Sequence, residues 1–155
     1  MRTIIQRVSQ SDITINGEKG GSIGKGFMVL VGVSEEDSEK EAEYLADKLV
    51  GLRVFSDSED KMNLALEDVG GELMIVSNFT LYANCKKGNR PSFVKAQKPP
   101  RATEIYDHFV DRVKAKFNGK IVTGEFGADM QINLTNDGPI TIIMDTDEMM
   151  PQNRK

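Results

Sequence analysis

The sequence has little of the chemistry on which metal and redox sites depend, since its 155 residues include one cysteine, one histidine and no tryptophan. The lone cysteine, Cys85, excludes an internal disulfide, and no cluster of cysteine and histidine offers zinc ligands. No apolar run approaches the ~20 residues that a membrane-spanning helix needs. We therefore expect no metal, no cofactor and no membrane segment. The amino-terminal segment also lacks the zones of a signal peptide, which predicts a cytoplasmic location.

The single histidine restricts the nucleophilic mechanisms open to this chain. A hydrolytic triad would have to include His108, which lies in an amphipathic helical pattern with Tyr106 and Phe109. We expect His108 to be a surface or half-buried residue of that helix. Cys85 is followed by Lys86, and a nearby cation lowers a thiol pKa, but no base accompanies the thiol. The sequence therefore predicts neither a triad nor a nucleophilic cysteine.

The net charge is −4, but the charge is unevenly distributed. Between Leu73 and Thr103 there is no acidic residue, whereas six of the 20 basic residues lie there. They are Lys86, Lys87, Arg90, Lys95, Lys98 and Arg101. Charge alone allows two interpretations, a solvated lysine-rich loop or a patch that contacts phosphate groups.

Short periodic segments predict a single α+β domain over residues 1–146 and a mobile tail over 147–155. Two main helices are expected to begin at Ser34 and Thr103, each a possible N-cap before an apolar stripe. Strands are expected over residues 3–8, 12–16, 27–33, 53–55, 73–83, 120–123, 128–135 and 140–145. Because turns join most of these strands, the sheet should be largely antiparallel and barrel-like.

The strand predicted from Leu73 carries polar side chains where apolar ones are expected. Alternation places Ser77 on one face of the strand, and Asn78 and Thr80 on the other. A buried polar group without a partner costs on the order of 1–3 kcal/mol. Either neighbouring strands satisfy these groups, or the strand ends near Phe79 and frees backbone N–H groups and a hydroxyl for a ligand.

A second unusual segment lies near the carboxyl end, between two apolar runs. It reads Asn136-Asp137-Gly138-Pro139-Ile140-Thr141. A proline removes a backbone donor where a hairpin strand should resume. Pro139 could mark an edge strand, or the Gly138–Pro139 bond could have a special geometry. About 5–6% of X-Pro bonds in folded proteins are cis, so composition does not decide the isomer.

Together these segments are similar to the two signature motifs of the D-aminoacyl-tRNA deacylase family, S-Q-F-T-L and N-x-G-P-x-T. The first stands here as Ser77-Asn78-Phe79-Thr80-Leu81, with Asn78 in place of the family's glutamine. The second is the segment 136–141. Further similarity covers nearly the whole chain and includes residues 6–9, 21–26, 87–93 and 126–130.

The resemblance implies a homodimer that hydrolyses the ester between a D-amino acid and the 3′ end of tRNA. It implies that glycyl esters are also accepted and that L-aminoacyl esters are rejected. The Gly138–Pro139 bond would be cis and reach into the other subunit's pocket, where the Gly138 carbonyl faces the substrate's α-amino group. Arg7 is expected to hold that loop, and Phe126 and Met130 to line the pocket.

The same resemblance assigns the catalytic role to Ser77, Asn78, Phe79 and Thr80. Backbone N–H groups of Phe79 and Thr80 could stabilise the oxyanion, an effect typically worth ~10²–10³ in rate per donor. The alternative makes the Thr80 hydroxyl the nucleophile, although the sequence offers no evident base for it. The ribose 2′-hydroxyl is a possible proton carrier. Lys86, Lys87 and Arg90 are expected to contact tRNA phosphates.

Two other functions stay open at this point. The chain could be a nucleic-acid-binding protein without catalytic activity, although its last residues contain no basic run. It could also be an esterase for small molecules, which would not need the basic loop.

Overall fold

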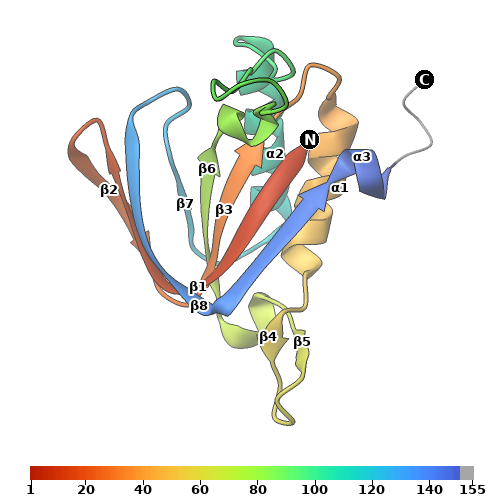
Figure 1. The fold of residues 1–155 in the computed structure, drawn as a ribbon. Helices are drawn as coiled ribbons and strands as arrows, with labels where there is room; N and C mark the ends of the chain where they lie inside the picture. The colour runs from red at the N-terminus through yellow and green to blue at the C-terminus, as the bar shows by residue number, and fades with distance from the viewer. Residues whose placement is uncertain (151–155) are drawn as a thin grey trace.

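The computed structural model describes residues 1–150, which form the predicted α+β fold (Figure 1). The eight strands are β1 (Arg2–Ile15), β2 (Glu18–Ile23), β3 (Gly26–Gly32), β4 (Phe55–Ser56), β5 (Met62–Leu64), β6 (Glu72–Ser77), β7 (Ile121–Thr123) and β8 (Met130–Asp145) among these residues. The helices of the same region are α1 (Glu39–Gly51), α2 (Arg101–Lys116) and α3 (Thr146–Met149), with short 3₁₀ turns η1 (Glu67–Val69) and η2 (Phe79–Tyr82).

The main sheet is mixed but mostly antiparallel, as predicted. Its strand order is β2-β1-β3-β6-β7, and β8 pairs with β1. The pairs β3–β6 and β6–β7 are parallel, whereas β1 pairs antiparallel with β2, β3 and β8. The sheet curls until β2 lies close to β7: a Cβ built on Gly21 of β2 would lie 2.6 Å from the Val122 side chain of β7. The result is a nearly closed barrel-like sheet.

Strand β1 organises the sheet because it has partners on both sides along its length. β8 pairs with it from Arg2 to Ile15 on one side. On the other side, β3 pairs with the first half of β1 and β2 with the second half. β1 and β8 bend together in the middle, as Figure 1 shows at the lower point where the two strands are labelled.

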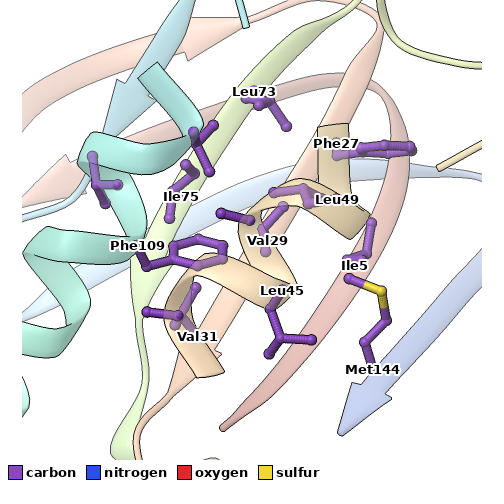
Figure 2. Packing of buried hydrophobic residues seen from close by; sticks show 14 of the residues in the cluster. Ile5, Phe27, Val29, Val31, Leu45, Leu49, Leu73, Ile75, Phe109 and Met144 are labelled. Carbon is purple, nitrogen blue, oxygen red and sulfur yellow. The ribbon is translucent and has the colours of Figure 1, made fainter. Parts of the chain in front are cut away.

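Helices α1 and α2 cover one face of this sheet and close the larger hydrophobic core (Figure 2). Ile5, Val29 and Ile75 of the sheet meet Leu45 of α1 and Phe109 of α2, and all five are fully buried. A smaller cluster occupies the opposite face, inside the curl of the sheet. It contains Val8, Ile13, Ile23, Met28, Met74 and Val76.

Both helix starts differ from the predictions. α1 is capped by Ser38, whose side chain and Glu41 form a capping box, whereas Ser34 lies in the preceding turn. The sequence signal for this helix start was Glu41, because a glutamate three residues after a serine is typical of a capping box. α2 follows Pro100 and begins before Thr103.

The predicted strands also differ in extent from the observed ones. Segments 3–8 and 12–16 are one strand, β1, and segments 128–135 and 140–145 are one strand, β8. The strand predicted over residues 73–83 ends at Ser77 and continues as η2. β4 and β5 form a separate small sheet, of which only a strand over residues 53–55 was predicted, and this overlaps β4 at Phe55.

The start of the predicted mobile tail is ordered, since α3 covers Thr146–Met149. Residues 151–155 lie outside the described part of the chain, so their mobility stays a prediction. Across residues 1–150, no helix is both long enough and apolar enough to cross a membrane.

Candidate active site

Strand β6 ends because its hydrogen-bond partners end. Its pairing with β3 stops at Ser77, opposite Val31, and its pairing with β7 stops two residues earlier. The N–H of Asn78 still donates to the Val31 carbonyl oxygen at 2.7 Å, and the chain then turns into η2. Gly32 makes room for this turn, since a Cβ there would lie 3.0 Å from the Cβ of Leu81.

The side chain of Asn78 caps the turn. Its Oδ1 accepts a hydrogen bond from the Thr80 N–H at 3.2 Å and another from the Thr80 hydroxyl at 2.5 Å. The first N–H groups of a helical turn have no acceptor within the turn. Because Asn78 takes the Thr80 N–H, the N–H of Phe79 is the donor at this strand end that has no hydrogen-bond partner among the described residues.

A cavity of about 360 Å³ opens beside this turn. One wall comes from the end of β6, with Ser77, Asn78 and Phe79. The opposite wall comes from the β7–β8 connection and the start of β8, with Phe126 and Met130. The other lining residues are Leu30, Val76, Gly127, Ala128, Asp129 and Ile132. Five of the predicted site residues are therefore brought together here, although they lie far apart in sequence.

Hydrogen bonds fix both walls of this cavity. Burial raises the pKa of the Tyr106 phenol well above its usual range, so the hydroxyl stays protonated and donates to the Ile75 carbonyl oxygen at 3.2 Å. The Gly124 N–H donates to the same carbonyl at 3.0 Å. Asn16, in the β1–β2 turn, donates its N–H to the Asp129 carbonyl at 2.8 Å and accepts from the Asp129 N–H at 3.2 Å.

The segment around Gly138 protrudes from the ladder between β1 and β8. Val8 is opposite Asn136 and Gln6 is opposite Thr141, so β8 contains three more residues than β1 over this interval. The Gly138–Pro139 bond is cis, as the resemblance implied. Gly138 has φ +124°, a conformation that favours glycine.

Arg7 holds this protruding segment from the bulge in β1. Its side chain is 12% exposed, and its Nε lies 3.3 Å from both the carbonyl oxygen and the carboxylate of Asp137. Its Nη1 donates to the Val54 carbonyl oxygen at 2.7 Å. The base of the segment is closed by Gln6 Oε1, which accepts from Asn136 Nδ2 at 2.8 Å and from the Thr141 hydroxyl at 2.5 Å.

Gly138, Pro139 and Arg7 do not line the 360 Å³ cavity of their own chain. In Figure 1 the bend of β8 lies at the lower point of the main sheet, whereas the β7–β8 connection that walls the cavity lies at the upper left. Within one chain, the predicted site residues therefore form two groups at different places on the sheet.

The predicted phosphate-contacting residues lie on a loop that follows η2, drawn in green at the top of Figure 1. Asn84 and Ser92 close its base through two backbone hydrogen bonds of 2.7 and 2.9 Å. Lys86, Lys87 and Arg90 are exposed between them.

The remaining titratable candidates are away from the cavity. His108 lies half-buried on α2, with its Nε2 3.0 Å from Glu43 Oε1 of α1, which confirms a surface or half-buried position on that helix. Cys85 is exposed. Residues 1–150 contain no group of three or more histidine, cysteine, aspartate or glutamate side chains that could hold a metal ion.

Sequence reasoning missed several residues of the cavity wall. Leu30 and Ile132 are partly buried apolar residues in strands, and their sequence pattern is that of ordinary core residues. Asp129 lies next to Met130, within the segment 126–130 that carried the resemblance. Its position in that segment could have indicated that it lines the cavity. No sequence signal indicated that Leu30 and Val76 would face this cavity.

Comparison with known proteins identifies the family. The family model described as D-Tyr-tRNA(Tyr) deacylase matches residues 4–145. The chain belongs to this family. The curated relatives described next are named D-aminoacyl-tRNA deacylases, which are hydrolases that act on the ester of aminoacyl-tRNA. The family match spans almost all of the described residues.

Curated relatives support the assignment to the deacylase family over nearly the full length. A D-aminoacyl-tRNA deacylase of Flavobacterium johnsoniae is 49% identical over 146 residues, covering 94% of this chain and 97% of the relative. One from Fusobacterium nucleatum is 51% identical, covering 94% of this chain and 96% of the relative.

Solved structures share the deacylase fold. The structure of a c-Myc DNA Unwinding Element Binding Protein superposes with a TM-score of 0.87 at 37% identity, covering 94% of this chain and 98% of the other. A probable eukaryotic D-amino acid tRNA deacylase superposes with a TM-score of 0.79 at 18% identity, covering 92% and 97%. The similarity to the eukaryotic protein shows a shared fold alone.

We predict that Asn78 stabilises the turn through its acceptor oxygen. Asn78→Ala should lower the free energy of unfolding by about 1 kcal/mol, because an N-cap acceptor is lost. Asn78→Asp keeps an acceptor of the same length and should unfold within a few tenths of a kcal/mol of the parent protein. Urea unfolding of the three proteins measures this. Equal stability of the alanine variant and the parent would contradict the capping role.

Proposed function

We propose that this protein hydrolyses the ester of D-aminoacyl-tRNA to free amino acid and tRNA, and that it accepts glycyl-tRNA while rejecting L-aminoacyl-tRNA. The observation that carries the proposal is at Phe79, which lines the cavity and whose N–H has no acceptor among the described residues. Membership of the deacylase family supplies the substrate class. A tRNA substrate also fits the cytoplasmic location predicted from the sequence.

In this proposal the Phe79 N–H stabilises negative charge on the ester carbonyl oxygen. Water attacks the carbonyl carbon, the bond to the ribose oxygen breaks, and the proton released by water passes to that oxygen, with the ribose 2′-hydroxyl as carrier. One backbone donor of this kind is typically worth ~10²–10³ in rate. The Thr80 N–H donates to Asn78 instead, so Asn78 contributes by orienting the turn.

We further propose that the Gly138–Pro139 segment acts in the cavity of a second subunit. The segment protrudes from the ladder and is absent from its own chain's cavity. β8 pairs only with β1 among the described strands, and Ile143 on it is 65% exposed, which leaves an edge open for another copy. Backbone atoms of Gly138 can then oppose an L side chain sterically without reading side-chain identity.

The basic loop is proposed to hold the tRNA by its phosphates. Lys86, Lys87 and Arg90 are exposed on a loop whose base is fixed by Asn84 and Ser92. Binding through phosphates releases counterions, so affinity should fall as salt rises.

The deciding experiment compares matched substrates that differ only in chirality. We expect the purified protein to release tyrosine from D-Tyr-tRNA and to leave L-Tyr-tRNA intact, because only the L side chain would collide with the Gly138 backbone. Release of labelled tyrosine over time measures this, with glycyl-tRNA as a third substrate. Equal rates on the D and L esters would contradict the proposal.

The role of the Thr80 hydroxyl can be tested with an isosteric change. It donates to the amide oxygen of Asn78, which is not a base, and no titratable side chain bonds to it within residues 1–150. We therefore expect Thr80→Val to keep activity within about tenfold of the parent, with Thr80→Ser as the matched control. Complete loss in the valine variant, with folding intact by circular dichroism, would instead support a nucleophilic threonine.

The shared site can be tested by mixing two inactive proteins. Gly138→Val should disable the protruding segment, since a Cβ there would lie 2.8 Å from the Ile140 side chain and 3.0 Å from its nitrogen. Ala128→Trp should fill the cavity. A mixed dimer then contains one site with an intact cavity and an intact segment, so mixing after partial unfolding should restore activity. If the mixture stays as inactive as its components, the segment does not act across subunits.

A second candidate function is nucleic-acid binding without catalysis. It is favoured by the likeness to the c-Myc DNA Unwinding Element Binding Protein, whose name denotes DNA binding. The same D-Tyr-tRNA assay distinguishes the two functions, because binding alone releases no tyrosine. A small-molecule esterase would cleave D-tyrosine esters that lack RNA at a comparable rate.

A further inference from the structure

We propose that Arg2 is a positioning residue for the hydrolysis, and that it acts by holding the carboxyl end of the η2 turn. The inference rests on the proposed function for the reaction, because this turn carries the Phe79 N–H. Arg2 lies before residues 4–145, the region that the family model matches, so its role does not follow from family membership.

The guanidinium of Arg2 binds the last part of η2 directly. Its Nη1 donates to the Leu81 carbonyl oxygen at 2.6 Å. The last carbonyl groups of a helical turn have no donor within the turn, so Arg2 supplies one that η2 itself lacks. Figure 1 shows the amino end of β1, marked N, beside the turn that follows β6.

Asp145, the last residue of β8, fixes the other two nitrogens of this guanidinium. Its Oδ2 lies 2.9 Å from Arg2 Nε and 2.8 Å from Arg2 Nη2. The Asp145 side chain is 9% exposed, so salt screens this ion pair less than a pair on the open surface. The other oxygen, Oδ1, accepts from the Asp147 N–H at 2.9 Å and caps α3. One carboxylate therefore joins Arg2 to α3.

The ring of Tyr82 supports the same guanidinium. Arg2 Cζ lies 4.8 Å from the centroid of the ring. Tyr82 is the last residue of η2 and is buried. Burial raises the pKa of the Tyr82 phenol above its usual range, so the ring stays neutral and attracts the cation through its face. Arg2 thus contacts two successive residues of the turn.

These contacts fix the turn at both ends. At its start, the Asn78 N–H donates to the Val31 carbonyl oxygen at 2.7 Å. At its end, Arg2 holds the Leu81 carbonyl. The Phe79 peptide lies between the two anchors, so its N–H can be reoriented only if one anchor moves.

The orientation of the Phe79 N–H matters because a backbone donor stabilises an oxyanion only where it points at the developing charge. Misplacement of a reacting geometry by about 1 Å can cost ~10²-fold in rate. Arg2 does not line the 360 Å³ cavity. Its loss should therefore slow the chemical step and leave substrate binding almost unchanged.

The chain offers a matched control for Arg2 in Arg112. Arg112 also binds one aspartate through two nitrogens, since its Nε and Nη2 lie 2.9 and 3.0 Å from the carboxylate oxygens of Asp47. The exposed fractions of the two arginine side chains are similar, 33% for Arg2 and 36% for Arg112. Arg112 joins α2 to α1, so its replacement removes an ion pair without removing a contact to η2.

We expect Arg2→Met to lower kcat for D-Tyr-tRNA by about ten- to 100-fold and to keep KM within about twofold of the parent. Methionine keeps an unbranched stem but has no donor for the Leu81 carbonyl. Arg112→Met should keep both kinetic constants close to those of the parent. If the two variants unfold at similar urea concentrations and hydrolyse D-Tyr-tRNA alike, Arg2 is only structural and the proposal is wrong.

Amide hydrogen exchange, followed by NMR, tests the same inference without a substrate. The Leu81 and Ala83 N–H groups donate to Asn78 and Thr80 within the turn, at 3.4 and 3.1 Å. Both should exchange faster in Arg2→Met than in Arg112→Met, because the turn opens more often when its end is released. Equal exchange in the two variants would contradict the proposal. A parent protein that fails the D-Tyr-tRNA assay, but whose turn loosens in this way, would keep Arg2 as the anchor of η2 and lose the proposed function.

Asp145→Asn provides the same comparison if Arg2→Met does not fold. Asparagine keeps an Oδ1 acceptor for the cap of α3 but presents no negative charge to Arg2. Relative to Arg112→Met, this variant should have a lower kcat and faster exchange at Ala83. Absence of both effects would overturn the proposal.

Discussion

The candidate site depends on the loss of hydrogen-bond partners at the end of β6. After Asn78 donates to Val31, no neighbouring strand continues the ladder, and the chain must satisfy its backbone groups locally. The Asn78 side chain does so for Thr80, whereas the N–H of Phe79, a residue that lines the cavity, has no acceptor among the described residues. One side-chain amide therefore determines which backbone group is available to a ligand.

The second constraint is the bend that β1 and β8 share. Three additional residues in β8 allow Gly138 and Pro139 to protrude from the sheet, and Arg7 fixes them from the opposite strand. Hydrogen bonds hold this segment, and Gly138 and Pro139 do not line the 360 Å³ cavity beside η2. A rigid backbone segment at an open sheet edge is well suited to act on a ligand bound by another copy, because little ordering is needed when the two meet.

Much of the fold could be predicted from local pattern, and the errors have identifiable causes. The apolar stripes of α1 and α2 were recognised, but Ser38 outcompetes Ser34 as the N-cap because only Ser38 has Glu41 three residues later. The predicted breaks within β1 and β8 are irregularities in strand pairing and not ends of strands, because the two strands pair on both sides of them. Propensity cannot detect such support from a distant strand.

The sequence by itself determined the two unusual segments, the uneven charge and the family, because these depend on residue identity and order. Only the tertiary structure decided that Ser77, Phe126 and Met130 share one cavity while Gly138 and Arg7 lie apart from it. It also decided that the rings of Phe79 and Phe93 meet edge to face. These arrangements depend on strand register and on how far the sheet curls, and both are set by contacts between residues that are distant in the chain.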